Sequence, residues 1–287
     1  MAHDPDRRRL LVAAWGGSAA LIGAWLPGGS HAAIGGLPSN VGHADSSPQW
    51  ELLRGKLFGE RPIAAGAASQ VQIIVPLRAA YGASVPVKIV SRIAQTPERQ
   101  VRRMTLLVDK NPSPIAATLT LGTALGQADF ETRLRVDEYS HVRVVSELSD
   151  GTLHMDSRYV KVSGGCSAPP NREALHLIGR TTMRLPAGLH PGAPTPVELS
   201  VVHPNDTGFE LNQVTVMFIP PHFVRSIRVR LGEALLFEAD TDFSISENPS
   251  WRFNFVPRAD QHALLTAEVE DTKEQRFRGT LDPWAAA

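Results

Sequence analysis

The sequence has only one cysteine, Cys166, among its 287 residues. A single thiol cannot form an intramolecular disulfide, a cysteine-rich zinc site or an iron–sulfur cluster by itself. The chain has no excess of positive or negative charge, because 29 Lys and Arg residues balance 29 Asp and Glu residues. A nucleic-acid-binding protein needs surplus positive charge to displace counterions from phosphates, so this class is excluded.

The usual catalytic motifs are also missing. The chain contains no P-loop, no Gly-x-Ser-x-Gly elbow, no His-Glu-x-x-His and no Gly-x-Gly-x-x-Gly. Its ten histidines are scattered without a pair at metal-ligand spacing on one element, and acidic residues cluster only in turns such as Asp137-Glu138. We interpret these side chains as surface or structural groups, and we expect no catalytic centre, no metal site and no resident cofactor.

Hydrophobic runs are short, and the longest lies near the N-terminus. An uncharged stretch from Leu10 to Leu26 follows consecutive arginines, and its glycines and length make it short for a membrane span. The small-x-small segment from Ser30 to Ala32 follows, so residues 1–32 are predicted to be a cleaved export signal of a periplasmic protein. Gly42 to Ala44 offers a second cleavage point. The arginines are similar to a twin-arginine signal, and general secretion stays open because the flanking residues differ.

The remainder of the chain shows one helical segment and many short strand patterns. Apolar residues at helical spacing predict a short helix from Pro48 to Gly59. Runs rich in Val, Ile, Thr and Leu, separated by turn-forming residues, predict strands. The predicted strands are 71–75, 87–93, 104–108, 117–121, 130–136, 140–147 and 152–162 in the first half, and 196–202, 214–219, 226–231, 235–239, 251–255, 264–270 and 276–281 in the second. Turns every ~8 to 12 residues favour two immunoglobulin-like β-sandwiches in tandem, an all-β protein.

A segment without periodicity divides the chain into halves of similar size. It covers residues 164–171 and contains Cys166. We therefore expect a first sandwich domain at 48–163, a Gly-Gly-Cys loop or linker at 164–171, and a second sandwich domain at 172–284.

Cys166 stands in an unusual context for a structural cysteine. It lies between Gly164-Gly165 and Ser167-Ala168, so we expect an exposed thiol, with the glycines supplying loop flexibility and room for a partner's active site. No charged residue is nearer in sequence than Lys161. An unperturbed thiol with a pKa of ~8.5 is only ~3% thiolate at pH 7, which suits a carrier activated inside a partner enzyme. A small residue incidental to the linker is the alternative, and a lone thiol also permits a Cys166-linked homodimer.

Several segments resemble a known pair of proteins. Three consecutive segments resemble the end of SoxY, the sulfur-carrier subunit of the periplasmic sulfur-oxidising system, and three loops of the second half resemble its partner SoxZ. The SoxY-like segments are 139–145, 149–155 and 160–166, with 57–63 and 111–114 also similar, and the SoxZ-like loops are 203–208, 219–223 and 246–250.

The resemblance implies a fused SoxYZ-like carrier, similar to single-chain proteins associated with quinoprotein alcohol dehydrogenases. In this family a cysteine holds a sulfur intermediate of sulfur or thiosulfate oxidation, as a thioester-like or persulfide adduct, while separate periplasmic enzymes act on it. Cys166 matches that cysteine. The family's carrier arm ends the chain, whereas here the chain continues, so Cys166 is tethered on both sides. The implied partners are loading and processing enzymes, c-type cytochromes or a quinoprotein dehydrogenase. A non-carrier adapter for such a dehydrogenase or its cytochrome is the alternative function.

Overall fold

The computed structural model describes residues 46–260 and 262–285, which belong to one compact unit spanning Ser39–Ala287. The export signal predicted over residues 1–32 lies outside the described residues. Within the described part, no helix is long and apolar enough to span a membrane.

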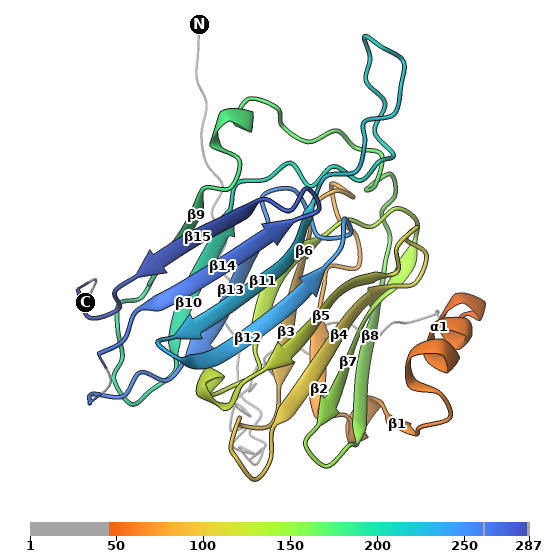
Figure 1. Cartoon of the computed structure of the whole chain (residues 1–287). Helices are drawn as coiled ribbons and strands as arrows, with labels where there is room; N and C mark the ends of the chain where they lie inside the picture. The colour runs from red at the N-terminus through yellow and green to blue at the C-terminus, as the bar shows by residue number, and fades with distance from the viewer. Residues whose placement is uncertain (1–45, 261, 286–287) are drawn as a thin grey trace, which may run out of the picture. The chain divides into compact units, whose positions relative to one another are not determined.

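The described residues form one α-helix, three 3-10 turns and fifteen strands (Figure 1), which confirms the predicted all-β class with two domains in tandem. The helices are α1 (Pro48–Phe58), η1 (Gly66–Ala68), η2 (Thr123–Leu125) and η3 (Leu175–Leu177). The first-half strands are β1 (Ile63–Ala64), β2 (Val71–Ile74), β3 (Val85–Ser91), β4 (Val101–Val108), β5 (Ile115–Leu121), β6 (Phe130–Leu134), β7 (Ser140–Leu148) and β8 (Leu153–Val160). The second-half strands are β9 (Thr181–Arg184), β10 (Thr195–Val201), β11 (Val224–Leu231), β12 (Ala234–Thr241), β13 (Ser250–Phe255), β14 (Leu265–Asp271) and β15 (Arg276–Leu281). The sequence pattern did not predict the short strands β1 and β9.

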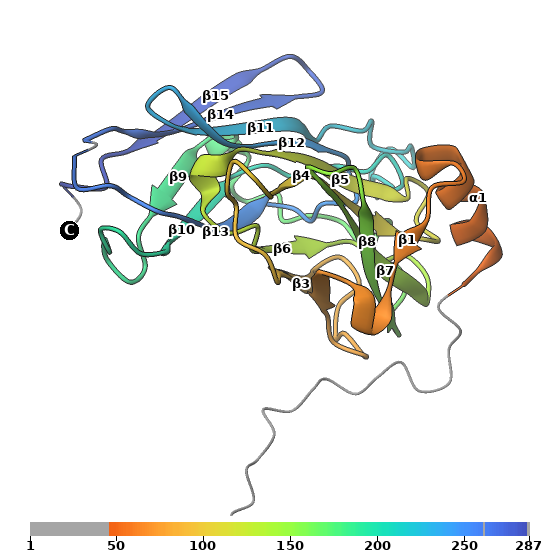
Figure 2. The ribbon, with the colours of Figure 1, turned by 90° about the horizontal axis from the view of Figure 1, so that it is seen from below.

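The two halves join edge to edge, so each sheet runs through both of them. One sheet has the order β1-β8-β7-β4-β5-β12-β11-β14-β15 and the other β2-β3-β6-β13-β10-β9, and Figure 2 shows them as two layers. The halves meet where β5 pairs with β12, with Leu121 opposite Phe237, and where β6 pairs with β13, with Phe130 opposite Phe253. Each half thus covers an edge that would otherwise expose unpaired backbone groups.

The hydrophobic core between the layers is continuous across the junction. Strict alternation in β10 and β13 turns one face of each strand inward, as the sequence pattern predicts. At the junction the rings of Phe130 and Phe237 meet edge to face at 5.3 Å, and those of Phe237 and Phe253 at 5.0 Å. Because these aromatic side chains come from both halves, the fusion is held by packing as well as by backbone pairing.

The helix predicted at Pro48 to Gly59 forms as α1 and packs on the outer face of the larger sheet. Its first turn is capped by Ser47, whose Oγ accepts the Trp50 N–H at 3.0 Å. Trp50 is buried, and the Arg143 guanidinium carbon lies 4.6 Å from the centroid of its ring. Arg143 also makes a buried bidentate ion pair with Asp109, both bonds being 2.8 Å. The pair fixes the helix over the sheet.

The strand predicted at 214–219 is wrong. The Asn212 side chain accepts the N–H groups of Val214 and Thr215, which forms a turn, and Val216 adopts a φ of 55°. The apolar side chains of this loop are exposed, Val214 to 91%. We name residues 211–218, which are closed by a β-bridge between their first and last members, the apolar hairpin.

Candidate functional site

The backbone around Cys166 is pinned to the segment that follows β6. The N–H groups of Gly164 and Gly165 donate to the carbonyl oxygens of Asp137 and Val136 at 2.8 and 3.1 Å. The Cys166 N–H donates to the Asp137 carboxylate at 3.1 Å. Asp137 was expected to be a solvated turn charge, and here its side chain holds the cysteine loop instead. We name residues 162–172 the Cys166 loop.

The glycines before the cysteine meet specific geometric demands. Gly164 has a φ of +74°, in the left-handed region that favours glycine. Gly165 lies so close to Gly82 and Val136 that a Cβ there would collide with both carbonyl oxygens. Gly82 is equally confined, since its own Cβ would come within 2.6 Å of the Ser163 carbonyl oxygen. Flexibility of the glycines remains a prediction, and in this conformation Gly165 permits close backbone packing.

Residues from both halves also hold the Cys166 loop in place. The Thr207 hydroxyl donates to the Cys166 carbonyl oxygen at 2.6 Å. The buried Arg135 guanidinium donates to the carbonyl oxygens of Gly165 at 3.0 Å, Ala168 at 3.3 Å and Asn205 at 3.3 Å. Arg135 therefore ties the end of the first half, the Cys166 loop and a second-half segment together.

The chain after the cysteine is also anchored. The Asn171 N–H donates to the Glu247 carboxylate at 2.8 Å, and Arg172 pairs with Asp206 at 2.5 Å. The Cys166 loop is therefore held on both sides of the cysteine, as expected for a chain that continues past it.

The thiol itself is buried, contrary to the expected exposure. Cys166 is 1% exposed. Burial, followed by the negative charge of Asp137, raises the pKa of the thiol from 9.0 to about 12, although Arg135 acts in the opposite direction. The expectation of an unperturbed thiol is therefore wrong as well. The sequence could not reveal the contacts around Cys166, because Asp137 and Thr207 lie 29 and 41 positions away. In this conformation Cys166 is protected and unreactive.

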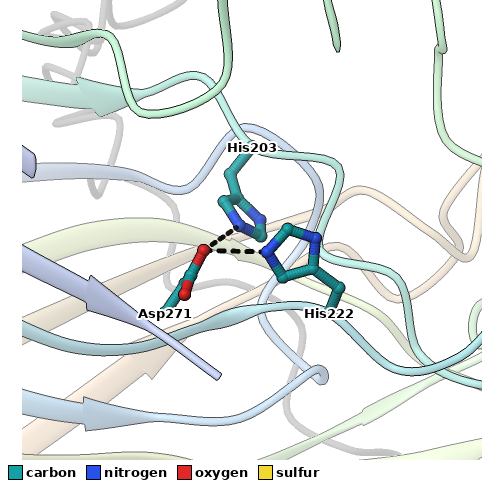
Figure 3. Close-up of side chains that lie close together, drawn as sticks. All are labelled: His203, His222 and Asp271. Carbon is teal, nitrogen blue, oxygen red and sulfur yellow. Dashed lines mark hydrogen bonds and ion pairs between the residues drawn. The ribbon is translucent and has the colours of Figure 1, made fainter. Parts of the chain in front are cut away.

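A second cluster of polar side chains lies in the second half, buried at the ends of three segments (Figure 3). His222 Nε2 donates to Asp271 Oδ2 at 2.8 Å, and His203 Nε2 lies 3.5 Å from the same oxygen. His203 Nδ1 accepts the Asn205 N–H at 3.1 Å, so a neutral His203 keeps its proton on Nε2. That proton occupies the position a metal ion needs, so the donor set does not suit a cation.

Burial, followed by the charge of the neighbouring His222, lowers the pKa of His203 from 6.5 to about 4, although Asp271 acts in the opposite direction. His203 is therefore neutral near pH 7. The cluster anchors the chain between β10 and β11, which carries both Thr207 and the apolar hairpin. Sequence spacing could not show this arrangement, because Asp271 is 49 positions from His222.

Comparison with known proteins matches the two halves separately. The family model of the sulfur oxidation protein SoxY matches residues 54–166 and that of SoxZ matches residues 183–282. The SoxY match ends at Cys166. No curated protein matches the chain.

Two solved structures are similar to part of the chain. The sulfur carrier protein SoxY from Chlorobium limicola f thiosulfatophilum is 24% identical over 40% of this chain and 91% of its own, with a TM-score of 0.32. A superoxide reductase (neelaredoxin) from Ignicoccus hospitalis is 11% identical over 35% of this chain and 95% of its own, with a TM-score of 0.32. Neither likeness bears on function at these values. The two family matches in tandem identify the chain as a SoxY–SoxZ fusion, a member of the SoxY and SoxZ families of sulfur oxidation proteins.

Proposed function

We propose that this fusion is a periplasmic carrier protein without a catalytic centre of its own, which holds a sulfur intermediate on Cys166 and presents it to partner enzymes. The observation that carries the proposal is the position of the cysteine. It ends the SoxY match and lies where both halves contribute contacts. The proposal assigns residues 1–32 to an export signal, 48–163 to the SoxY-like domain, 164–171 to the carrier loop and 172–284 to the SoxZ-like domain.

The simplest loading step is transfer of sulfane sulfur. The Cys166 thiolate attacks the outer sulfur of a donor persulfide, the sulfur–sulfur bond of the donor breaks, and the donor leaves as a thiolate. The new sulfur–sulfur bond on Cys166 carries the cargo with no net oxidation. Loading with an inorganic sulfur anion instead releases two electrons per bond formed, and a c-type cytochrome partner is the class of protein that accepts them. Fusion of the halves replaces association of two subunits by an intramolecular contact at roughly millimolar effective concentration.

The burial of the thiol bears on how the carrier works. A group with a pKa of about 12 supplies almost no thiolate near neutral pH, and at 1% exposure it reaches no donor. Loading therefore requires the Cys166 loop to open. This requirement favours a carrier activated by a partner over a protein that reacts unaided.

One observation favours the alternative function, a non-carrier adapter for a periplasmic quinoprotein alcohol dehydrogenase or its cytochrome. The apolar hairpin exposes Val214, Val216, Met217 and Phe218 to at least 66% each. Exposed apolar patches mark protein-binding surfaces in many proteins, and a buried thiol is consistent with a structural cysteine.

A substitution of Cys166 separates the two functions. In the native host, Cys166→Ser should abolish oxidation of sulfur compounds as completely as deletion of the gene, while the variant accumulates to the normal level. Full complementation by Cys166→Ser, with the dehydrogenase or cytochrome still co-purifying, would favour the adapter. Electrophoresis without reductant tests the Cys166-linked homodimer, which the adapter and the carrier both allow only after the loop opens.

A further inference from the structure

The charges around the buried thiol are mostly negative. The negative charges of Asp137, Glu210 and Asp242 each raise the pKa of Cys166, whereas the positive charge of Arg135 lowers it. Asp137 also binds the Cys166 N–H directly. An anion placed on the sulfur in this pocket would face more negative than positive charge at short range in a medium that screens poorly.

The closed loop is also closely packed around Cys166. Gly165 is in contact with the backbone of Gly82 and Val136, and the thiol is 1% exposed. An adduct extends the side chain by at least one sulfur atom. Protein interiors are close-packed, so such an extension requires the loop to move.

The side chain of Thr207, in the second half, hydrogen-bonds to the backbone of the cysteine itself. Thr207 Oγ1 donates to the Cys166 carbonyl oxygen at 2.6 Å and accepts the Phe209 N–H at 3.1 Å. The Glu210 carboxylate accepts the Thr207 N–H at 3.1 Å and so fixes the threonine backbone. Thr207 thus lies at the base of the apolar hairpin, and its hydroxyl joins that base to the cysteine.

We propose that the Cys166 loop is closed only in the unloaded carrier, that an anionic adduct on the sulfur opens it, and that Thr207 is the positioning residue that holds it closed. The inference rests on the proposed function, because a loaded state exists only if Cys166 carries cargo. A partner enzyme then distinguishes empty from loaded carrier by the position of the loop. The empty thiol is shielded from oxidants while it waits.

Two chemical adducts of similar length and opposite charge test the role of the pocket. Methanethiosulfonate reagents transfer their thioalkyl group to the Cys166 thiolate, which forms a disulfide and releases methanesulfinate. One reagent leaves a sulfonatoethyl group and the other an aminoethyl group. Hydrogen exchange of the Gly164, Gly165 and Cys166 amides, all hydrogen-bonded in the closed loop, then reports opening.

The sulfonatoethyl adduct should speed exchange of these amides by about tenfold or more over the unmodified full-length protein, and clearly more than the aminoethyl adduct. Cys166→Ser protein treated with either reagent should remain unchanged. Protection equal in the sulfonatoethyl adduct and the unmodified protein would overturn the proposal. Equal opening by both adducts would overturn its electrostatic part.

Variants of Thr207 test whether its hydroxyl holds the Cys166 loop closed, without any adduct. Thr207→Val keeps the shape and removes the hydroxyl, so the same amides of unloaded protein should exchange about tenfold faster, the usual effect of one lost hydrogen bond. Thr207→Ser should restore the protection. The amides of β15, the strand at the edge of the larger sheet, should be unaffected in both variants, which excludes a general loss of stability. Unchanged protection in Thr207→Val would contradict the role of Thr207.

These results are independent of the physiological cargo. Opening by the sulfonatoethyl adduct, combined with full function of Cys166→Ser in the host, would keep the loop mechanism and reject the carrier. Loss of function in Cys166→Ser, combined with a loop that stays closed in the adduct, would keep the carrier and reject this inference.

Discussion

Replacement of Gly165 by alanine should make the buried thiol reactive. A Cβ at this position would collide with the carbonyl oxygens of Gly82 and Val136, neither of which can move without disturbing its strand connection. The collision is avoided when the Cys166 loop leaves its closed position. Gly165 itself is not a member of the hydrophobic core, so the two sheets should remain folded.

The size of the effect follows from the pKa of the thiol. In the closed loop the pKa is about 12, whereas the ordinary value is 9.0. At pH 8 these values correspond to roughly 0.01% and roughly 10% thiolate, a difference of about 1,000-fold. Because the thiolate is the reacting species, the alkylation rate of Gly165→Ala should exceed that of the native protein by about this factor.

Iodoacetamide labelling at pH 8, followed by intact mass, measures the rate. Gly55→Ala is the matched control, because the helical Gly55 has nothing within 4 Å of its added Cβ. Urea denaturation of both variants confirms that the sheets are intact. A Gly165→Ala protein that reacts no faster than Gly55→Ala would refute the closed-loop account of the thiol.

Three further predictions concern stability. His203 has a pKa of about 4 in the folded protein and 6.5 when unfolded, so the unfolded chain binds more protons between these values. Stability should fall by about 3 kcal/mol as pH drops from 6.5 to 4, and equal urea midpoints at pH 7 and pH 4.5 would contradict this. Arg143→Met leaves the Asp109 carboxylate buried without its bidentate arginine partner and should lower the free energy of unfolding by about 3 to 5 kcal/mol, measured by chemical denaturation, whereas a loss below about 1 kcal/mol would rule out a role for the pair. Val216→Asn removes a β-branched side chain from a backbone φ of 55°, where such residues are strained, and should raise the free energy of unfolding by up to about 1 kcal/mol. A lower free energy of unfolding in calorimetry would contradict this prediction.

The strands of the sandwich were predictable because each half-buried strand alternates along its own sequence. The alternation of Trp251, Phe253 and Phe255 is a local signal, and β13 follows it. The run at 214–219 has the same apolar character, and Asn212 turns it into a hairpin by accepting backbone N–H groups. A pattern of apolar residues does not show that a polar side chain competes with strand pairing for these backbone N–H groups.

The site was predictable only in part. The family resemblance and the Gly-Gly-Cys segment single out Cys166, while its burial depends on tertiary contacts. Asp137, Thr207 and Arg135 reach the loop from distant positions and from both halves. The joining of the two halves through β5 and β12 is equally non-local, because the strand pattern of each half is also compatible with a separate sandwich.

The intact mass of the mature protein isolated from its native host tests the central claim most directly. It is taken with and without a reductant and compared with that of Cys166→Ser. The carrier account predicts a reductant-labile mass increase confined to Cys166, equal to one or more sulfur atoms or a sulfur oxyanion. An unmodified thiol under growth conditions that express the protein would contradict it.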